Sequence, residues 1–283
     1  MLETIVVRTK HNEVSFRKCK PHGNCVIGSK NEDIEKLISQ GQNPKYLIRE
    51  TPQKKITLAP YFLQTFPVSI QLFREFIDET NYSPLVEKLS EGSIFQNSSW
   101  TSEKGLSWFN DLTSKKRLSN NTPVTRIFYD DAKSFAEWFG SYLTNLPLTA
   151  RLPTEAEFEV AASYDLNSSE LKKREFSWTN KKDALKQLRK MSGLCSIDEL
   201  PHEVNGFKGL CGVIWQWCED FYANNYLDII SSQDPLLSEK HEYHSLRGGS
   251  FLFDERSWRP TYRSCPSGNY SSYGFRLALT FQK

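Results

Sequence analysis

Apolar residues recur at helical spacing in several parts of the chain. The large apolar residues that follow Ser69 fall on one face of a helix, which predicts an amphipathic helix over residues 70–79 with Ser69 as its N-cap. A second apolar stripe predicts a helix over residues 130–143, capped by Asp130. A shorter helical pattern lies inside residues 30–49. The chain is therefore expected to contain few helices.

The clearest local signal is a capping box. Thr154 is followed three residues later by Glu157. The threonine hydroxyl can accept a hydrogen bond from the Glu157 amide, while the Glu157 carboxylate accepts one from the Thr154 amide. This pattern predicts a helix through residue 162 with Phe158 facing the core, and we interpret the motif as structural.

Short apolar runs bounded by Gly and Pro are typical of strands. They fall at residues 3–7, 14–16, 23–29, 55–58 with a continuation at 61–63, 212–218, 245–247 and 275–281. Residues 83–120 are rich in Ser, Asn and Lys and are expected to be an inserted loop region. Residues 163–200 are polar, with helical character only at 183–190. Short strands, few helices and many loops predict an irregular α+β fold, and nothing divides residues 1–283 into two domains.

Basic and acidic residues nearly balance. The chain has 36 Lys and Arg against 34 Asp and Glu, a formal net charge of +2. A nucleic-acid-binding protein normally carries a clustered basic excess, so nucleic acid is not expected as a partner. The basic clusters at residues 115–117 and 172–174 lie among Ser, Asn and Glu and are interpreted as solvated loops.

No apolar run approaches the length of a membrane span, which is about 18 to 20 residues. Residues 1–8 also lack the pattern of a signal peptide, because their apolar run is short and their charges come early. We therefore expect no membrane insertion. The expected location is cytoplasmic, or that of a soluble domain of a larger protein.

The six cysteines show no zinc-ligand spacing and no CxxC pair. In a chain of this length, free buried thiols are favoured over a disulfide framework. His241 and His244 form an H-x-x-H pair, but no third ligand lies nearby in the sequence. No metal site is therefore predicted from these residues.

Four motifs follow one another along the chain: RLPTEAEFE at 151–159, GVIWQW at 212–217, RGGS at 247–250 and GFR at 274–276. Together they resemble the formylglycine-generating enzyme, or sulfatase-modifying factor, domain family. The resemblance covers about residues 14–281. It implies the family's irregular variant of the C-type-lectin fold, an α+β fold with short strands, few helices and many loops.

The segment after the RGGS turn departs from the family's enzymes. The resemblance implies two cysteines there that bind copper, and thiolates are required because soft sulfur ligands hold Cu(I) tightly. Residues 251–258 read FLFDERSW and contain no cysteine, while Cys265 lies beyond Arg263. No copper and no other cofactor is therefore expected, and the chain is expected not to be an enzyme.

The resemblance also implies a calcium-binding loop of the form GNxWEW, in which Asn and Glu contribute to binding. Those positions are Val213 and Gln216 in this chain. Calcium needs hard oxygen ligands, preferably anionic, so the two exchanges should remove most of the affinity. No calcium is expected.

This chain has the family's motifs but lacks the cysteine pair. We therefore interpret it as a non-catalytic binding or scaffolding module, a pseudoenzyme whose partner is a protein or peptide. Related domains form the C-terminal parts of some bacterial serine/threonine kinases, so a kinase-attached setting is one expectation. The alternative is a divergent oxidoreductase or chromophore-maturation enzyme that uses the same cleft. For that alternative the charged candidates are Asp254, Glu255 and Arg256.

Eight residues are candidates for ligand or partner binding, because most of them combine the aromatic and arginine side chains that are enriched at interface hot spots. They are Trp217, Ser250, Phe253, Arg256, Trp258, Arg259, Tyr262 and Arg263. A structural alternative stays open. In that alternative the Trp and Tyr side chains fill the core, while Arg259 and Arg263 hold loops by bonding carbonyls or carboxylates.

Overall fold

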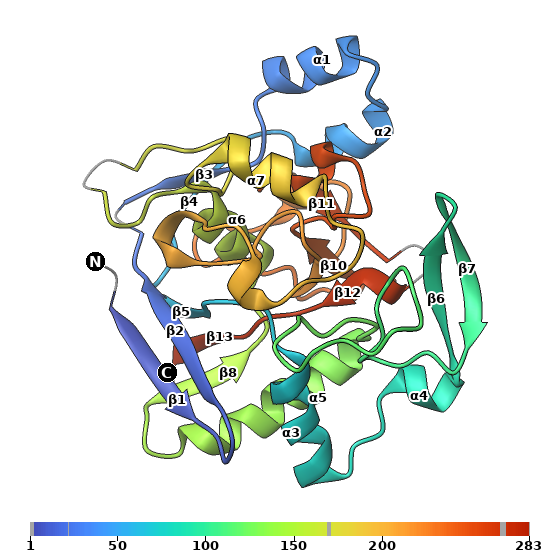
Figure 1. Cartoon of the computed structure of the whole chain (residues 1–283). Coiled ribbons are helices and arrows are strands. Elements are labelled where there is room, and N and C mark those ends of the chain that lie inside the picture. Colours follow the sequence, from blue (N-terminus) through green and yellow to red (C-terminus); the bar gives the residue numbers. More distant parts are fainter. Residues whose placement is uncertain (1–2, 22, 169–170, 267–269, 283) are drawn as a thin grey trace.

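The computed structural model describes residues 3–21, 23–168, 171–266 and 270–282. Its largest sheet has five antiparallel strands in the order β1-β2-β5-β13-β8 (Figure 1). The strands are β1 (Thr4–Arg8), β2 (Glu13–Cys19), β5 (Tyr61–Gln64), β8 (Leu148–Arg151) and β13 (Ala278–Phe281). The sheet therefore joins segments from both ends of the described chain.

Side chains on the two faces of this sheet belong to two hydrophobic cores. In β5, Tyr61 and Leu63 lie in one core and Phe62 in the other, as the alternation of a strand requires. The helices α3 (Ile70–Thr80) and α5 (Tyr129–Gly140) cover the Phe62 face. Both cores thus depend on the same strands.

A second sheet has four strands in the order β11-β10-β9-β12. The strands are β9 (Trp215–Phe221), β10 (His244–Arg247), β11 (Arg263–Ser264) and β12 (Tyr273–Gly274). β12 runs parallel to β9, and the other pairs are antiparallel. Trp215 and Trp217 alternate onto one face of β9 and are buried in the core.

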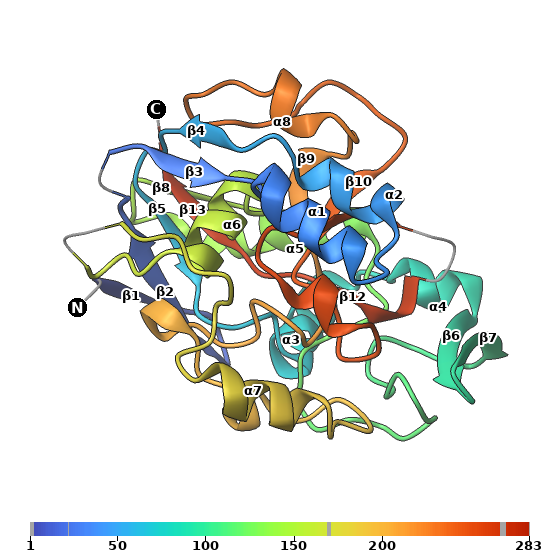
Figure 2. The same ribbon diagram turned by 90° about the horizontal axis from the view of Figure 1, so that it is seen from above.

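Short strand pairs and helices surround these two sheets. The pairs are β3 (Cys25–Ile27) with β4 (Lys54–Ile56), and β6 (Glu91–Gln96) with β7 (Ser99–Lys104). Further helices are α1 (Asn31–Ser39), α2 (Pro44–Leu47), α4 (Leu85–Leu89), α6 (Glu155–Ser163), α7 (Lys181–Leu188) and α8 (Tyr226–Ile229). Figure 2 shows α7 and α8 on opposite sides of the molecule. No helix in the described part of the chain has both the length and the apolar character that a membrane crossing demands.

Both long helices that the sequence predicts are present. The Ser69 hydroxyl accepts a hydrogen bond from the Leu72 amide at 3.2 Å, which confirms Ser69 as the N-cap of α3. The prediction that Asp130 caps α5 is wrong. Asp131 does this from the third position, where its carboxylate reaches back and accepts from the Phe128 amide at 2.9 Å.

Two segments differ from the sequence predictions. Residues 83–120 hold α4 and the β6–β7 hairpin instead of an irregular loop region, and Phe95 pairs with Trp100 across the hairpin with ring centroids 5.2 Å apart. The strand predicted at 55–58 does not continue into β5. Pro60 lies between them and has no N–H to donate to a strand ladder, so β4 and β5 pair in different sheets.

Candidate functional site

Helix α6 forms the structural centre of the candidate site. The Thr154 hydroxyl accepts from the Glu157 amide at 3.2 Å, and the Glu157 carboxylate accepts from the Thr154 amide at 2.8 Å. This confirms the predicted capping box. The carboxylate of Glu157 also pairs with Arg151, and all nine residues of α6 are buried. The start of α6 is therefore fixed by local hydrogen bonds and by burial together.

Two carboxylates of α6 are paired with buried arginines of the second sheet. Glu155 accepts from Arg263 at 2.6 and 2.7 Å, and Glu159 accepts from Arg247 at 2.6 Å. Burial alone would raise the pKa of Glu155, but Arg263, Arg247 and the Ser245 hydroxyl together hold that pKa below its ordinary value. Burial also opposes ionisation of Glu159, and Lys173 and Arg247 together lower its pKa. The two arginines thus hold α6 against β10 and β11.

The two glycines of the RGGS motif determine the path of the chain after β10. Gly248 has φ of 96°, and a Cβ atom there would lie 2.4 Å from the carbonyl oxygen of Leu210. Gly249 has φ of 71°, and its Cβ would lie 2.4 Å from the carbonyl oxygen of Ser257. Only glycine fits either position. The turn therefore places residues 250–258 close against the core.

Two tryptophans among the candidate residues are part of the core. Trp217 donates its Nε1–H to the Ile127 carbonyl at 2.8 Å, and Trp258 donates to the Ser250 carbonyl at 2.8 Å. Both rings and Ser250 are buried. Each indole thus has its polar atom satisfied inside the protein, which fits the structural alternative for these side chains.

The two candidate arginines also have internal partners. Arg259 donates to both carboxylate oxygens of Glu50 at 2.6 and 2.7 Å. Arg263 bonds Glu155 and, in addition, the carbonyl oxygens of Arg49 and Ala223. Both guanidinium groups therefore make hydrogen bonds that connect parts of the fold. Arg259 also lines an open hollow.

The other three candidate residues are accessible. Phe253 is 41% exposed and packs the edge of its ring against Trp215 at 5.9 Å between centroids. Tyr262 is half-buried on the same tryptophan, also at 5.9 Å. Arg256 is half-buried and bonds Asp254, two residues before it. These side chains are available to a ligand without unfolding the segment.

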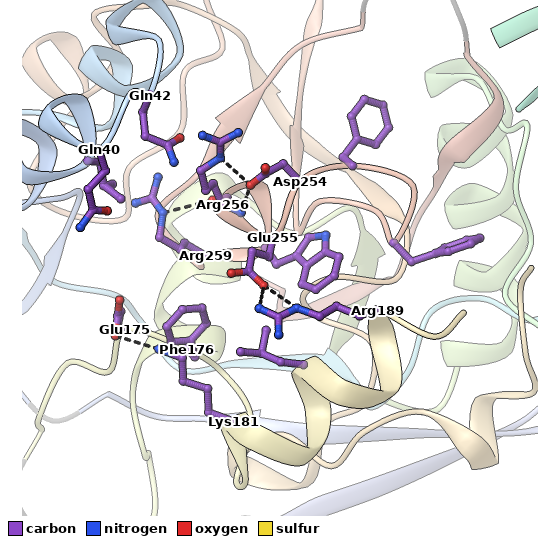
Figure 3. Close-up of a pocket in the computed structure, with 15 residues that line it drawn as sticks. Gln40, Gln42, Glu175, Phe176, Lys181, Arg189, Asp254, Glu255, Arg256 and Arg259 are labelled. Atoms are coloured by element: carbon purple, nitrogen blue, oxygen red, sulfur yellow. Dashed lines mark hydrogen bonds and ion pairs between the residues drawn. The ribbon is translucent and has the colours of Figure 1, made fainter. Parts of the chain in front are cut away.

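A hollow of about 800 Å³ lies between α1, α7 and residues 251–259 (Figure 3). A second hollow of about 670 Å³ adjoins it and extends toward residues 28–36 and 173–174. Four residues line both hollows: Leu37, Gln40, Glu175 and Arg259. We call the two hollows together the trough. It is the open space next to the RGGS turn.

The walls of the trough combine apolar and charged side chains. Phe176 and Leu185 line the first hollow and are half-buried, so they give it apolar surface. Arg189 of α7 pairs with Glu255 across it, with Nε 2.9 Å from Oε2. The sequence predicted helical character at 183–190 but gave no sign that this helix faces the segment after RGGS. That contact joins residues 66 positions apart.

In the loop that resembles a calcium site, the side-chain amide of Gln216 bonds the backbone carbonyl oxygens. Gln216 donates its Nε2–H groups to the carbonyl oxygens of Gly209 and Leu210 at 2.8 and 3.2 Å. Its Oε1 accepts from Arg276 at 2.7 Å, and Val213 is buried. The carbonyl oxygens that converge on this position therefore already have N–H donors.

All six cysteines are described by the structure, and all are free. Burial raises the pKa of Cys19 to about 12 and that of Cys25 to about 11, so neither thiol is activated. None of the six lies in residues 250–258, beside the trough. Within the described residues there is also no group of three or more His, Cys, Asp or Glu placed to hold a metal ion.

The sequence of this chain matches a known domain family and several known proteins. Residues 12–281 match the model of the sulfatase-modifying factor enzyme 1-like domain. The formylglycine-generating enzyme of Mus musculus is 22% identical over 270 residues, covering 81% of this chain and 68% of that protein. The serine/threonine-protein kinase Pkn1 of Chlamydia trachomatis is 27% identical over 239 residues, covering 81% of this chain but 34% of the kinase.

A solved structure is similar over nearly its full length. PvdO from Pseudomonas aeruginosa matches with a TM-score of 0.67 at 16% identity, over 97% of each chain. At this identity the likeness concerns the fold. It confirms the predicted class, an irregular α+β fold with short strands and few helices.

The prediction that the chain is not an enzyme is wrong. The mouse relative is named as an enzyme and matches most of this chain, which points to an enzyme. The prediction rested on the missing cysteine pair. Groups other than thiols also carry out chemistry, so the missing pair does not exclude catalysis.

Proposed function

The chain belongs to the sulfatase-modifying factor enzyme 1-like domain family, and from this membership we propose that it recognises a protein or peptide segment in the trough. The observation that carries the proposal is the trough itself, two adjoining hollows of about 800 and 670 Å³ beside the RGGS turn. Sites for small ligands commonly occupy about 300 to 1,000 Å³. Two adjoining hollows of this size give room for an extended chain.

The side chains around the first hollow suit recognition of a polypeptide. Phe253 and Arg256 are accessible and belong to residue types that often dominate binding energy at interfaces. Trp258 and Arg259 lie beneath them and are held by internal hydrogen bonds. A fixed floor lowers the entropy that ordering costs on binding.

A setting inside a larger signalling protein is part of the same proposal. Its support is the chlamydial kinase, which this chain matches over about a third of the kinase's length, 34%. The reading frame that encodes this chain tests the point directly. An adjoining kinase domain would support the setting, and a flank without one would remove it.

A second candidate function is catalysis in the same trough, and the mouse relative named as an enzyme favours it. No cysteine lies in residues 250–258, so the reacting groups would be others. Asp254 and Glu255 border the first hollow, and carboxylates of this kind serve in proton transfer. Copper or iron near one per purified chain, together with a new product by mass spectrometry, would favour this candidate over recognition alone.

A selection for peptide ligands tests the recognition proposal. The immobilised chain is used to select from a displayed library of random 12-residue peptides, and selected peptides are measured against the Phe253→Ala, Arg256→Ala double variant. We expect affinity to fall at least tenfold, or about 1.4 kcal/mol. The melting temperature should change little, because both side chains are accessible.

The matched control pair is Arg8→Ala with Leu236→Ala, one exposed arginine and one exposed apolar residue elsewhere on the surface. This pair should leave peptide affinity within twofold of the unaltered chain. Failure to select any peptide would overturn the proposal. Equal binding by both double variants would also overturn it, since the trough would then not be the binding surface.

A further inference from the structure

Basic residues concentrate on one side of the trough. Residues 171–190 contain eight Lys and Arg against two acidic residues, a net charge of +6, whereas the whole chain has a net charge of +2. Five of these eight lie in α7 or directly after it. More than half of these basic residues therefore lie on or directly after the helix that walls the trough, and the other three precede it at 172–174.

Successive residues of a helix are about 100° apart, so side chains four positions apart in and after α7 form stripes, one of which holds Asp183 and Gln187. Ala184 and Leu188 are buried and hold the helix against the core. The stripe that begins at Lys181 lines the trough, as Figure 3 shows for Lys181 and Arg189. Another stripe is exposed and lies next to the trough-lining stripe: Lys182, Lys186 and Lys190.

Among the residues that the structure describes, these three lysines have no carboxylate within ion-pair distance, and neither have Lys30 and Lys36. Lys30 and Lys36 line the second hollow from the α1 side. In contrast, the four cations that line the first hollow are each paired with a carboxylate. On the α1 side Asp33 lines the second hollow beside Lys30 and Lys36, and α1 also carries Glu32 and Glu35, so the positive charge there is balanced. Uncompensated positive charge thus lies along α7, while the first hollow is internally neutralised.

We propose that the ligand of the trough is an acidic polypeptide segment with one aromatic or large aliphatic side chain at its centre. This inference rests on the proposed recognition function and names the class of partner. The free lysines favour carboxylates through complementary potential, which raises the association rate and selects against basic partners. The apolar surface of the half-buried Phe176 and Leu185 fits the central side chain.

The shape of the surface favours a peptide over other anionic partners. A bilayer is flat and touches protruding side chains, so it would leave the apolar floor of the trough unused. Nucleic acid duplexes carry charge without an exposed apolar group, and they would also leave the floor unfilled. An acidic peptide with an apolar centre can use the lysines and the floor together.

Fluorescence anisotropy with two labelled peptides tests the inference. One is a 12-residue peptide of Asp and Glu with a central Phe, and the other replaces each Asp by Asn and each Glu by Gln. We expect the acidic peptide to bind at least tenfold more tightly. Its affinity should fall at least fivefold between 50 and 300 mM salt, because exposed charges are screened over about 10 Å or less.

The triple variant Lys182→Glu, Lys186→Glu, Lys190→Glu should bind the acidic peptide at least tenfold more weakly. The matched control carries the same charge change at exposed lysines outside the trough and α7: Lys10→Glu, Lys104→Glu and Lys240→Glu. We expect the control to stay within threefold of the unaltered chain. Circular dichroism of both variants checks that each is folded.

Equal binding of the two peptides would overturn the acidic preference while leaving peptide recognition in place. Equal weakening by both triple variants would show a response to overall charge and would also overturn the inference. Tighter binding to phosphatidylserine vesicles or to duplex DNA than to the acidic peptide would assign the basic surface to those partners instead. If neither labelled peptide binds and the library selection also fails, the proposed recognition function fails with it.

Discussion

At the scale of single residues, hydrogen bonds inside the protein separate structural side chains from available ones. Trp258 is 2% exposed and donates to the Ser250 carbonyl, while Phe253 is 41% exposed on the same segment. We predict that Trp258→Ala lowers the free energy of unfolding by about 3 to 5 kcal/mol, the usual cost of emptying a large aromatic site. Phe253→Ala is the control and should cost less than about 1 kcal/mol. Urea denaturation of both variants decides between these roles, and equal losses would contradict the assignment.

Some of these residue roles could be predicted from the sequence and others could not. The Thr154 capping box is complete within four residues, so its spacing was sufficient. The pair of Glu155 and Arg263 joins positions 108 residues apart, and nothing in either local sequence identifies the partner. Long-range partners depend on the packing of α6 against the second sheet, which local propensity does not contain.

At the scale of elements, the buried ion pairs between α6 and the second sheet make stability depend on pH. The pKa of Glu159 is lowered in the folded state by Lys173 and Arg247. The stabilisation of the folded state by ionised Glu159 is therefore fully present above the unfolded pKa of about 4.3. It is lost as the pH falls through the lower pKa of the folded state. We predict that Glu159→Gln costs about 3 kcal/mol at pH 7, because Arg247 loses a buried anionic partner.

The difference in unfolding free energy between Glu159→Gln and the unaltered chain should shrink steadily as the pH falls from 5 to 3. Glu13→Gln is the control, since Glu13 pairs with Arg8 on the surface and should matter by less than about 1 kcal/mol. A difference that stays constant with pH would contradict the role of the charged form.

The β6–β7 hairpin is the element that sequence reasoning missed. Its strands are mostly polar, so the alternation that identifies a strand is weak, and its turn residues Asn97 and Ser98 have φ of 51° and 62°. Two positive φ values match a tight hairpin turn, in which glycine follows asparagine most often. In the sequence, the Asn97-Ser98 pair could have indicated the hairpin turn. Phe95 and Trp100, placed symmetrically about that pair, could have indicated the paired strands.

We predict that Ser98→Gly stabilises the hairpin by about 0.5 to 1 kcal/mol, because glycine adopts positive φ without a steric penalty. Slower amide hydrogen exchange across β6 and β7 would measure the gain. Ser102→Gly lies within β7 and should accelerate exchange, since glycine weakens a strand interior. Faster exchange in the Ser98 variant would show that the turn conformation is different.

At the scale of the whole molecule, the two cores share the strands of the five-stranded sheet, so the loss of one core should also disrupt the other. We predict a single calorimetric transition whose enthalpy equals the van't Hoff enthalpy. Phe76→Ala in one core and Trp258→Ala in the other should each lower that same transition without splitting it. Two resolved transitions, each sensitive to one variant, would instead divide the chain into two units.

The place of β13 has a consequence for how the chain is made. This strand lies between β5 and β8, yet it is the last strand in the described sequence. A ribosome adds about 5 to 20 residues per second, so the other strands of the sheet emerge well before the one that joins them. During that interval the inner edges of β5 and β8 have no partner, and such edges can pair with other chains. Newly made protein should therefore need protection from aggregation until β13 has left the ribosome and paired with both strands.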